Sequence, residues 1–209
     1  MSRKLRILIT AGPTREPIDP VRFIGNRSSG KMGAALVTAA IEAGHEVTLI
    51  AGSMSAIVPP VRRIDVETAA EMQSAVLNEF PNHDLLIMSA AIADFRPIRT
   101  SQQKLGRDDS IIIECEPTED IVASAAQIRR ADQRIIAFSL ESDGNVERAR
   151  SKMTKKAVDL MVFNALSTMQ SDTIRATMLS PTRSDESLPV LDKSSFARHL
   201  IKSAESLMD

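Results

Sequence analysis

The chain has 209 residues, of which 43% are hydrophobic and 25% charged, and its 26 Lys and Arg against 27 Asp and Glu leave a formal net charge of −1. This length and composition are typical of one large, soluble globular domain with its own core, and they exclude a disordered or collagen-like chain. The near-zero net charge, together with six Phe and no Trp or Tyr, argues against nucleic acid as a partner.

Short β-branched runs alternate with longer segments of helical periodicity. The predicted strands are residues 5–10, 45–50, 62–66, 84–89, 111–115, 134–139 and 160–163. The predicted helices are residues 31–43, 68–80, 119–129 and 145–157. This alternation predicts βαβ units with right-handed crossovers. We therefore expect a three-layer, Rossmann-like α/β fold with a mostly parallel sheet and helices on both faces.

The alternation ends after Asn164. Residues 177–180 and 188–191 predict two hairpin strands, a small antiparallel extension of the sheet, and residues 194–207 predict a last helix. We expect a single domain over residues 1–209, with a core at 1–164 and a divergent hairpin and C-terminal helix at 165–209.

The few Cys and His residues and the lengths of the apolar runs bear on metals and membranes. The single cysteine, Cys115, cannot form an internal disulfide, and three scattered His offer no zinc centre. The N-terminal apolar run is too short for a signal peptide, and no later run reaches transmembrane length. The sequence therefore predicts a cytoplasmic protein with no protein-held metal and no membrane contact.

Two connections are unusually long or polar. Residues 11–29 form a connection of about 19 residues, whereas such connections usually have about 2–6 residues. Residues 96–110 are mostly polar. Because open α/β sheets bind ligands at loops that follow the carboxyl ends of their strands, we expect the binding site at these two segments.

The first of these connections contains part of a nucleotide-binding motif. Gly25-x4-Gly30-Lys31 resembles the start of a P-loop, but Met32 stands where the metal-binding hydroxyl belongs. Only Gly30-x-x-Gly33 remains of the dinucleotide fingerprint, and no acid follows the strand at 45–50. A P-loop and a nicotinamide site are both disfavoured, although a nicotinamide-dependent oxidoreductase stays as a lower alternative.

The same segment is still consistent with a simpler anion site at the start of a helix. Ser28, Ser29 and Gly30 precede the helix, where free backbone N–H groups and the helix dipole attract anions. Asn26 and Arg27 stand just before them and could orient a carboxylate or phosphate. An ordinary serine-capped helix is the alternative.

The segment ITAGPTREPIDPVRFIGNRSSGKMG, followed by SAAIADFRP and a downstream lysine, resembles the phosphopantothenoylcysteine synthetase domain of coenzyme A biosynthesis. The resemblance covers about residues 5–164. In that family the domain is often the C-terminal half of a bifunctional protein whose other half is a flavin-dependent decarboxylase. No such half is present in these 209 residues, so the chain resembles a stand-alone synthetase or an excised domain, without flavin, and a separate decarboxylase chain is left open as a partner.

The resemblance implies a ligase that joins 4′-phosphopantothenate to L-cysteine. The substrate carboxylate attacks the α-phosphate of CTP or ATP, with Mg²⁺ and release of pyrophosphate, and the cysteine amine then displaces the nucleoside monophosphate from the acyl-nucleotide. It also implies a homodimer that forms through residues around 98–115 or through the tail hairpin. A non-catalytic or altered-substrate relative that binds phosphopantothenate-like ligands or nucleotides is the alternative.

The same resemblance implies the site residues. The catalytic residues would be Asn26 and Lys104. Phosphopantothenate would be bound by Asn26, Arg27, Ser28, Ser29 and Gly30. The nucleotide would be bound by Gly12, Ser89, Ala90, Ala91, Asp94, Lys104, Asp120, Phe138, Lys152 and Lys156. The sequence departs from the family pattern at residues 105–107, 137–140 and Ala165, which leaves the choice between CTP and ATP open and favours the non-catalytic alternative.

Overall fold

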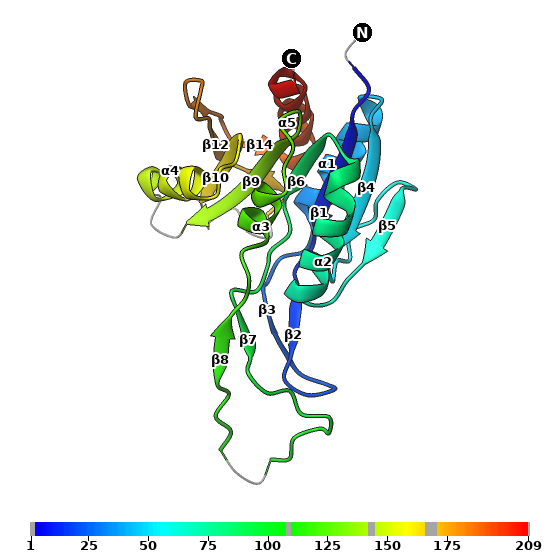
Figure 1. Ribbon diagram of the computed structural model, residues 1–209, viewed down its shortest axis with the longest axis vertical. Coiled ribbons are helices and arrows are strands. Elements are labelled where there is room, and N and C mark those ends of the chain that lie inside the picture. The colour runs from blue at the N-terminus through cyan, green and yellow to red at the C-terminus, as the bar shows by residue number, and fades with distance from the viewer. Residues whose placement is uncertain (1–2, 108–109, 142–144, 166–170, 209) are drawn as a thin grey trace.

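The computed structural model describes residues 3–107, 110–141, 145–165 and 171–208. Within these residues, eight strands form one sheet in the order β13-β12-β10-β9-β6-β1-β4-β5 (Figure 1). Their bounds are β1 Arg6–Ala11, β4 Glu46–Ala51, β5 Arg62–Asp65, β6 Leu85–Met88, β9 Arg134–Glu141, β10 Leu160–Ala165, β12 Ala176–Leu179 and β13 Glu186–Ser187. Neighbours from β5 to β10 pair in parallel, whereas β12 and β13 pair antiparallel at the edge.

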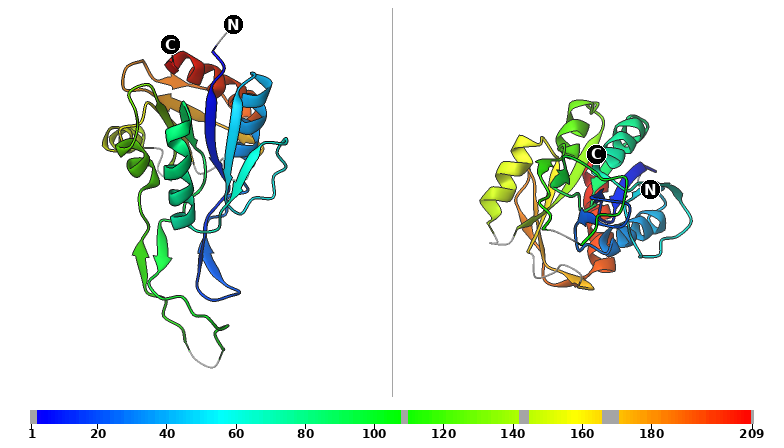
Figure 2. Two further views of the ribbon diagram at one scale, coloured as in Figure 1. Left: turned by 45° about the vertical axis from the view of Figure 1, so that its right-hand side comes forward. Right: turned by 90° about the horizontal axis from the view of Figure 1, so that it is seen from below.

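Helices cover both faces of this sheet (Figures 1 and 2). The helices α1 (Lys31–Glu42) and α5 (Lys193–Met208) pack on one face. The helices α2 (Ala69–Glu79), α3 (Ile121–Gln127) and α4 (Val146–Lys155) pack on the other. A short 3-10 turn, η1 (Phe80–Asn82), follows α2. The three-layer α/β prediction is therefore confirmed.

The central strands are buried on both faces. In β1, Ile7 and Ile9 join the core that α1 and α5 cover, while Leu8 joins the core under α2, α3 and α4. This is why the strand reads as a continuous apolar run and not as an alternating one. In the tail, Phe196 and Leu200 of α5 are fully buried in the first of these cores, so the last helix packs as part of the sheet's cover.

Three two-stranded ribbons lie outside the main sheet. The strands β2 (Arg15–Pro17) and β3 (Phe23–Gly25) form one, and β7 (Phe95–Pro97) and β8 (Cys115–Pro117) form another. Together they extend beyond the carboxyl end of the sheet as an arm, visible at the bottom of Figure 1 and in the left view of Figure 2. The third ribbon joins β11 (Thr173–Ile174) to β14 (Leu191–Asp192).

Two predicted strands are wrong in position. Of residues 111–115, only Cys115 lies in a strand, and Ile111, Ile112 and Ile113 are 49%, 90% and 40% exposed. An apolar run predicted a buried strand here, but this segment belongs to the arm, where no core covers it. The hairpin partner of β12 is β13 and not residues 188–191, because β12 pairs in a register that places Met178 opposite Glu186.

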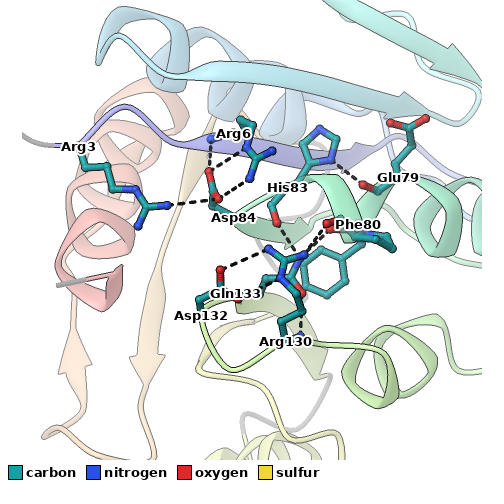
Figure 3. A network of polar contacts seen from close by, with 10 residues as sticks. Arg3, Arg6, Glu79, Phe80, His83, Asp84, Arg130, Asp132 and Gln133 are labelled. Carbon is teal, nitrogen blue, oxygen red and sulfur yellow. Dashed lines mark hydrogen bonds and ion pairs between the residues drawn. The ribbon is translucent and has the colours of Figure 1, made fainter.

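The amino end of the sheet is closed by a polar network (Figure 3). The Asp84 carboxylate, 4% exposed, accepts hydrogen bonds from the Arg6 backbone N–H at 2.8 Å and from the Arg6 guanidinium at 2.9 Å, and it pairs with Arg3 at 3.5 Å. Burial alone would raise the pKa of Asp84, but the Arg6 hydrogen bonds and the charges of Arg6 and Arg3 outweigh it, so the pKa lies below its ordinary value. In the same network, Gln133 donates to the Phe80 and His83 carbonyls.

Replacing Asp84 tests this closure. We expect Asp84→Asn to lower the free energy of unfolding by about 2 kcal/mol at pH 7, because a charge-assisted pair with Arg6 is lost. A lowered folded-state pKa gives stability above the unfolded-state pKa, which disappears as pH falls through the folded-state value. Urea unfolding of the wild type should therefore weaken below about pH 4 more steeply than that of the variant.

Asp132→Asn is the matched control for this experiment. Its carboxylate also pairs with an arginine, Arg130, but it is 61% exposed, so its removal should change the free energy of unfolding by less than about 0.5 kcal/mol. Equal losses in the two variants would contradict a special role for the buried carboxylate.

Candidate functional site

The sheet has a topological switch point between β1 and β6. The chain runs outward from β1 to β4 and β5, and then returns to β6 on the other side of β1. Ligands in such sheets bind beyond the carboxyl ends of the strands at this point. A cavity of about 560 Å³ lies here, and its walls include the segments after both strands. The location expected from the long connection after β1 is therefore where the structure places a cavity.

The segments after β1 and β6 continue the parallel pairing of the two strands. The Ala91 N–H donates to the Gly12 carbonyl at 3.0 Å, and the Thr14 N–H donates to the Ala91 carbonyl at 3.2 Å. The Ser89 hydroxyl donates to the Thr10 carbonyl at 2.6 Å. The two sequence motifs are thus joined by backbone and hydroxyl hydrogen bonds into one wall.

Glycines let helix α1 begin against this wall. A Cβ on Gly33 would lie 2.2 Å from the Ala11 Cβ, so only glycine permits the observed approach of α1 to β1. Gly30 caps the helix at φ 75°, in the left-handed region that favours glycine. The Ser28 hydroxyl accepts from the Gly30 N–H at 3.4 Å, outside the helix. The alternative of a serine-capped helix is therefore wrong, since the cap is Gly30 with no side-chain hydrogen bond.

Asn26 connects the first motif to the second. Its Nδ2 donates to the Ala91 carbonyl at 3.1 Å and to the Ile92 carbonyl at 2.8 Å. Two carbonyl oxygens fix the orientation of the amide, because only the NH₂ group can face them. Both amide protons are used, so the remaining polar atom of the side chain is Oδ1, a hydrogen-bond acceptor. A carboxylate would gain an amide donor from Asn26 only if Nδ2 left these carbonyls.

The opposite wall comes from α3 and α4. Asp120 is the N-cap of α3 and accepts from the Ala123 N–H at 3.1 Å. Its other carboxylate oxygen pairs with the Lys156 Nζ at 3.0 Å. Lys152 of α4 and Lys156, the C-cap residue of that helix, both line the cavity, as the i, i+4 spacing predicts. A cation and an anion are therefore held in contact at this wall.

The end of β9 supplies the apolar part of the lining. Phe138 lines the cavity and also meets Phe196 of α5 edge to face, with ring centroids 6.5 Å apart. This contact ties Phe138 to the core on the α1 and α5 face. Met161 and Ile174 are among the other apolar residues of the lining.

The structure brings most of the expected residues together. Those that line the cavity are Asn26, Ser28, Ser29, Ser89, Ala90, Ala91, Asp94, Asp120, Phe138, Lys152 and Lys156. The expected residues outside its lining are Gly12, Arg27, Gly30 and Lys104. Gly12 and Gly30 lie behind the cavity wall, where the absence of a side chain lets the backbone pack against Met54.

Lys104 is exposed on the segment between β7 and β8. The neighbouring Leu105 is held by the β2–β3 turn: its N–H donates to the Asp19 carboxylate at 3.2 Å, and the Arg22 guanidinium donates to its carbonyl at 3.2 Å. Burial would raise the pKa of Asp19, but backbone hydrogen bonds from Val21, Leu105 and Arg22 and the Arg22 charge lower it below its ordinary value. In this arrangement the Lys104 segment is held against the β2–β3 turn and does not line the cavity.

Sequence reasoning missed two cations of the lining, Lys31 and Lys193. Lys31 directly follows Gly30 and begins α1. The partial P-loop match, Gly25-x4-Gly30-Lys31, already contained this lysine and could have identified it. Lys193 carries no local signal, because it reaches the cavity only through the packing of α5 on α1.

Acidic residues at the cavity are few. The carboxylates in its lining belong to Asp94, Glu119 and Asp120. In the described part of the chain, no three His, Cys, Asp or Glu side chains come together in a way that could hold a metal ion. Among the same residues, no helix is both long and apolar enough to span a bilayer.

Comparison with known proteins places these features in context. The family described as the DNA/pantothenate metabolism flavoprotein C-terminal domain matches residues 2–207. A relative named cysteine/cysteine sulfinic acid decarboxylase, from an unknown prokaryotic organism, is 38% identical over 97% of the chain and 58% of its own length. The coenzyme A biosynthesis bifunctional protein CoaBC of Vibrio vulnificus (strain YJ016) is 39% identical over 97% of the chain and 52% of its own length. The chain thus spans little more than half of these relatives.

A solved structure is similar as well. The crystal structure of the C-terminal domain of the bifunctional protein CoaBC superposes with a TM-score of 0.85 at 36% identity, covering 100% of this chain and 97% of that one.

Replacing Gly33 tests the close approach of α1 to the wall. At an unhindered helix position, Gly→Ala stabilises by about 1 kcal/mol. We expect Gly33→Ala instead to lower the free energy of unfolding by about 2 kcal/mol, because the new Cβ would overlap Ala11. Ala35→Gly, on the same helix, is the control and should cost about 1 kcal/mol. A gain in stability for Gly33→Ala, measured by urea unfolding, would rule out the tight contact.

Proposed function

The chain belongs to the family of the DNA/pantothenate metabolism flavoprotein C-terminal domain, and from this premise we propose that it is a phosphopantothenate–cysteine ligase of coenzyme A biosynthesis. It would activate 4′-phosphopantothenate with CTP or ATP, release pyrophosphate, and transfer the acyl group to the amine of L-cysteine. The observation that supports this most is the cavity at the switch point, where the Asn26 motif and the Ser89–Asp94 motif form one wall facing Lys152 and Lys156.

The cavity suits anionic reactants. Substrate carboxylate and nucleotide phosphate repel each other in water, so a ligase must hold both close together and neutralise the charge that develops at the α-phosphate. Lys152 and Lys156 supply positive charge from α4, and the segment at Ser28 and Ser29 supplies hydroxyl and backbone donors. Small residues at 89–91 leave room for a ligand against the backbone wall.

Asn26 would position the acyl group. Its amide now bridges to the Ala91 and Ile92 carbonyls, so it also sets the distance between the two motifs. Rotation of this amide toward the substrate carboxylate would exchange two backbone contacts for a contact with the reacting group. The side chain would thus couple substrate binding to the geometry of the wall.

Mg²⁺ fits this site as an ion that arrives with the nucleotide. It prefers to keep several waters and to bind phosphate oxygens with few protein ligands. Asp94 and Glu119 are the cavity's carboxylates that would face its water shell, since Asp120 is engaged by Lys156. When bound, the ion would supply charge neutralisation at the phosphates.

The exposed arm supports the proposal of a homodimer. Phe95, Ile98 and Ile112 are 56%, 52% and 90% exposed on the β7–β8 ribbon and its connection, and Phe23 on the adjacent β3 is 47% exposed. Exposed apolar side chains gathered on one projection are typical of protein–protein contacts. We expect a second copy of this chain to cover them. A separate decarboxylase chain is proposed as a further partner on the family resemblance alone.

Pyrophosphate release tests the reaction. With phosphopantothenate, cysteine, Mg²⁺ and either CTP or ATP, we expect the wild type to release pyrophosphate and form phosphopantothenoylcysteine, detected by mass spectrometry. Asn26→Asp should lower kcat/KM by at least about a hundredfold, because a carboxylate repels both the two backbone carbonyls and the substrate carboxylate.

Asn82→Asp is the control, because it makes the same change of charge and size at an exposed residue of η1, near the amino end of the sheet. This variant should retain the wild-type rate. Wild-type turnover by Asn26→Asp would remove Asn26 from the site. If the wild type turns over no nucleotide but still binds phosphopantothenate, the chain is the non-catalytic relative that the departures at 105–107 and 137–140 favour.

The dimer has its own test. We expect Ile112→Asp to weaken self-association by about tenfold or more, measured by sedimentation equilibrium, because a charge would be buried in the contact. Ile57→Asp is the matched control, since Ile57 is 94% exposed on the connection between β4 and β5. Equal association constants for the two variants would show that the arm is not the contact.

A further inference from the structure

The cations of the cavity come from both faces of the sheet. Lys152 lies in α4 and Lys156 is its C-cap residue, and α4 packs on the same face as α2 and α3. Lys31 and Lys193 are the first residues of α1 and α5, which pack on the opposite face. All four side chains line one cavity. The carboxyl edge of the sheet is therefore flanked by one lysine pair on each side.

The pair from α1 and α5 shares a single carboxylate. The Lys31 Nζ lies 2.6 Å from the Asp172 Oδ1. The Lys193 Nζ donates to the Ser171 carbonyl, and its backbone N–H donates to the Asp172 carbonyl at 3.1 Å. Two ammonium groups thus meet at residues 171–172, where the Asp172 carboxylate pairs with Lys31.

The compensating carboxylate is open to exchange. The Asp172 side chain is 85% exposed, and that of Lys31 is 47% exposed. Exposed ion pairs of this kind contribute little to stability, so another anion can replace the carboxylate at small cost. Lys193 is different, because its burial, followed by the nearby charge of Lys31, lowers its pKa below the ordinary value. An added anion between the two ammonium groups would offset their mutual repulsion.

Space for such an anion is present on both sides of the pair. Lys31 and Lys193 also line a second cavity of about 420 Å³, whose lining includes alanines of α1 and the carboxylates of Glu42, Asp172 and Asp192. The two side chains therefore stand between cavities and are not packed into the core. A phosphate group could reach them without any rearrangement of the sheet.

We propose that Lys31 and Lys193 form a phosphate-binding subsite on the α1 and α5 side of the cavity, separate from Lys152 and Lys156. The proposal rests on the proposed function, in which two phosphate-bearing substrates must be held at once. Because two polyanions repel each other, a lysine pair on each side of the reacting groups would hold them apart. The ligand group is a phosphate, either the terminal phosphate of phosphopantothenate or the polyphosphate of the nucleotide.

Calorimetric titration distinguishes these sources. Lys31→Ala and Lys193→Ala are titrated with CTP, ATP, phosphopantothenate, pantothenate and inorganic pyrophosphate, and Lys202→Ala, an exposed lysine of the same helix α5, is the control. We expect both variants to lose about tenfold or more in affinity for a phosphorylated ligand, whereas pantothenate affinity stays unchanged. A loss confined to CTP or ATP assigns the subsite to the nucleotide, and a loss confined to phosphopantothenate assigns it to the terminal phosphate.

The direction in which Asp172→Asn changes the pyrophosphate affinity distinguishes a binding role of the two lysines from a purely structural one. Asp172→Asn removes the competing carboxylate, so it should tighten pyrophosphate binding severalfold. If the lysines only anchor residues 171–172, Asp172→Asn would loosen the wall and weaken binding instead. That result, or affinities in Lys31→Ala and Lys193→Ala equal to those of Lys202→Ala, would overturn the subsite.

The two proposals can fail independently. A wild-type chain that shows no ligase turnover, but whose pyrophosphate affinity falls in Lys31→Ala and Lys193→Ala, would refute the proposed function and retain the subsite. Ligase turnover with unchanged pyrophosphate, nucleotide and phosphopantothenate affinities in both variants would retain the function and refute the subsite. No binding of any phosphate compound by the wild type would refute both.

Discussion

The parallel pairing of β1 with β6 does not stop where the strands end. Ala91 continues it by bonding to Gly12 and Thr14, and Asn26 adds two side-chain bonds to the same segment. Everything at the cavity depends on this junction, because it brings together two motifs that are some 65 residues apart in the chain. A polar network around Asp84 lies at the other end of these strands, whereas the cavity lies at their carboxyl end.

Close packing and charge distribution then give the junction its chemistry. Gly33 lets α1 approach β1, which places Lys31 at the edge of the cavity. The packing of α5 on α1 adds Lys193, and α4 adds Lys152 and Lys156 from the other face. A chain with a formal net charge of −1 thus gathers four lysines around one cavity. Net charge describes the whole surface and says little about such a local arrangement.

Local sequence patterns predicted what depends on local physics. The helices α1, α2 and α4 and the strands of the parallel sheet lie within one or two residues of their expected bounds, because caps and apolar periodicity act over one element. Residues 111–115 and 188–191 were misplaced for the opposite reason. An apolar run indicates burial only if a partner covers it, and a hairpin's register depends on the strand that it joins.

The sequence by itself determined the α/β class and predicted the place of the cavity and many of the residues that line it, since the motif at 9–33 and the residues at 89–94 follow the two strands beside the switch point. Only the tertiary structure decided how Asn26 uses its amide, that the Lys104 segment is held against the β2–β3 turn, and that Lys193 reaches the cavity. Each of these depends on contacts between residues more than 60 positions apart. No local periodicity or spacing encodes such contacts, because packing of whole elements creates them.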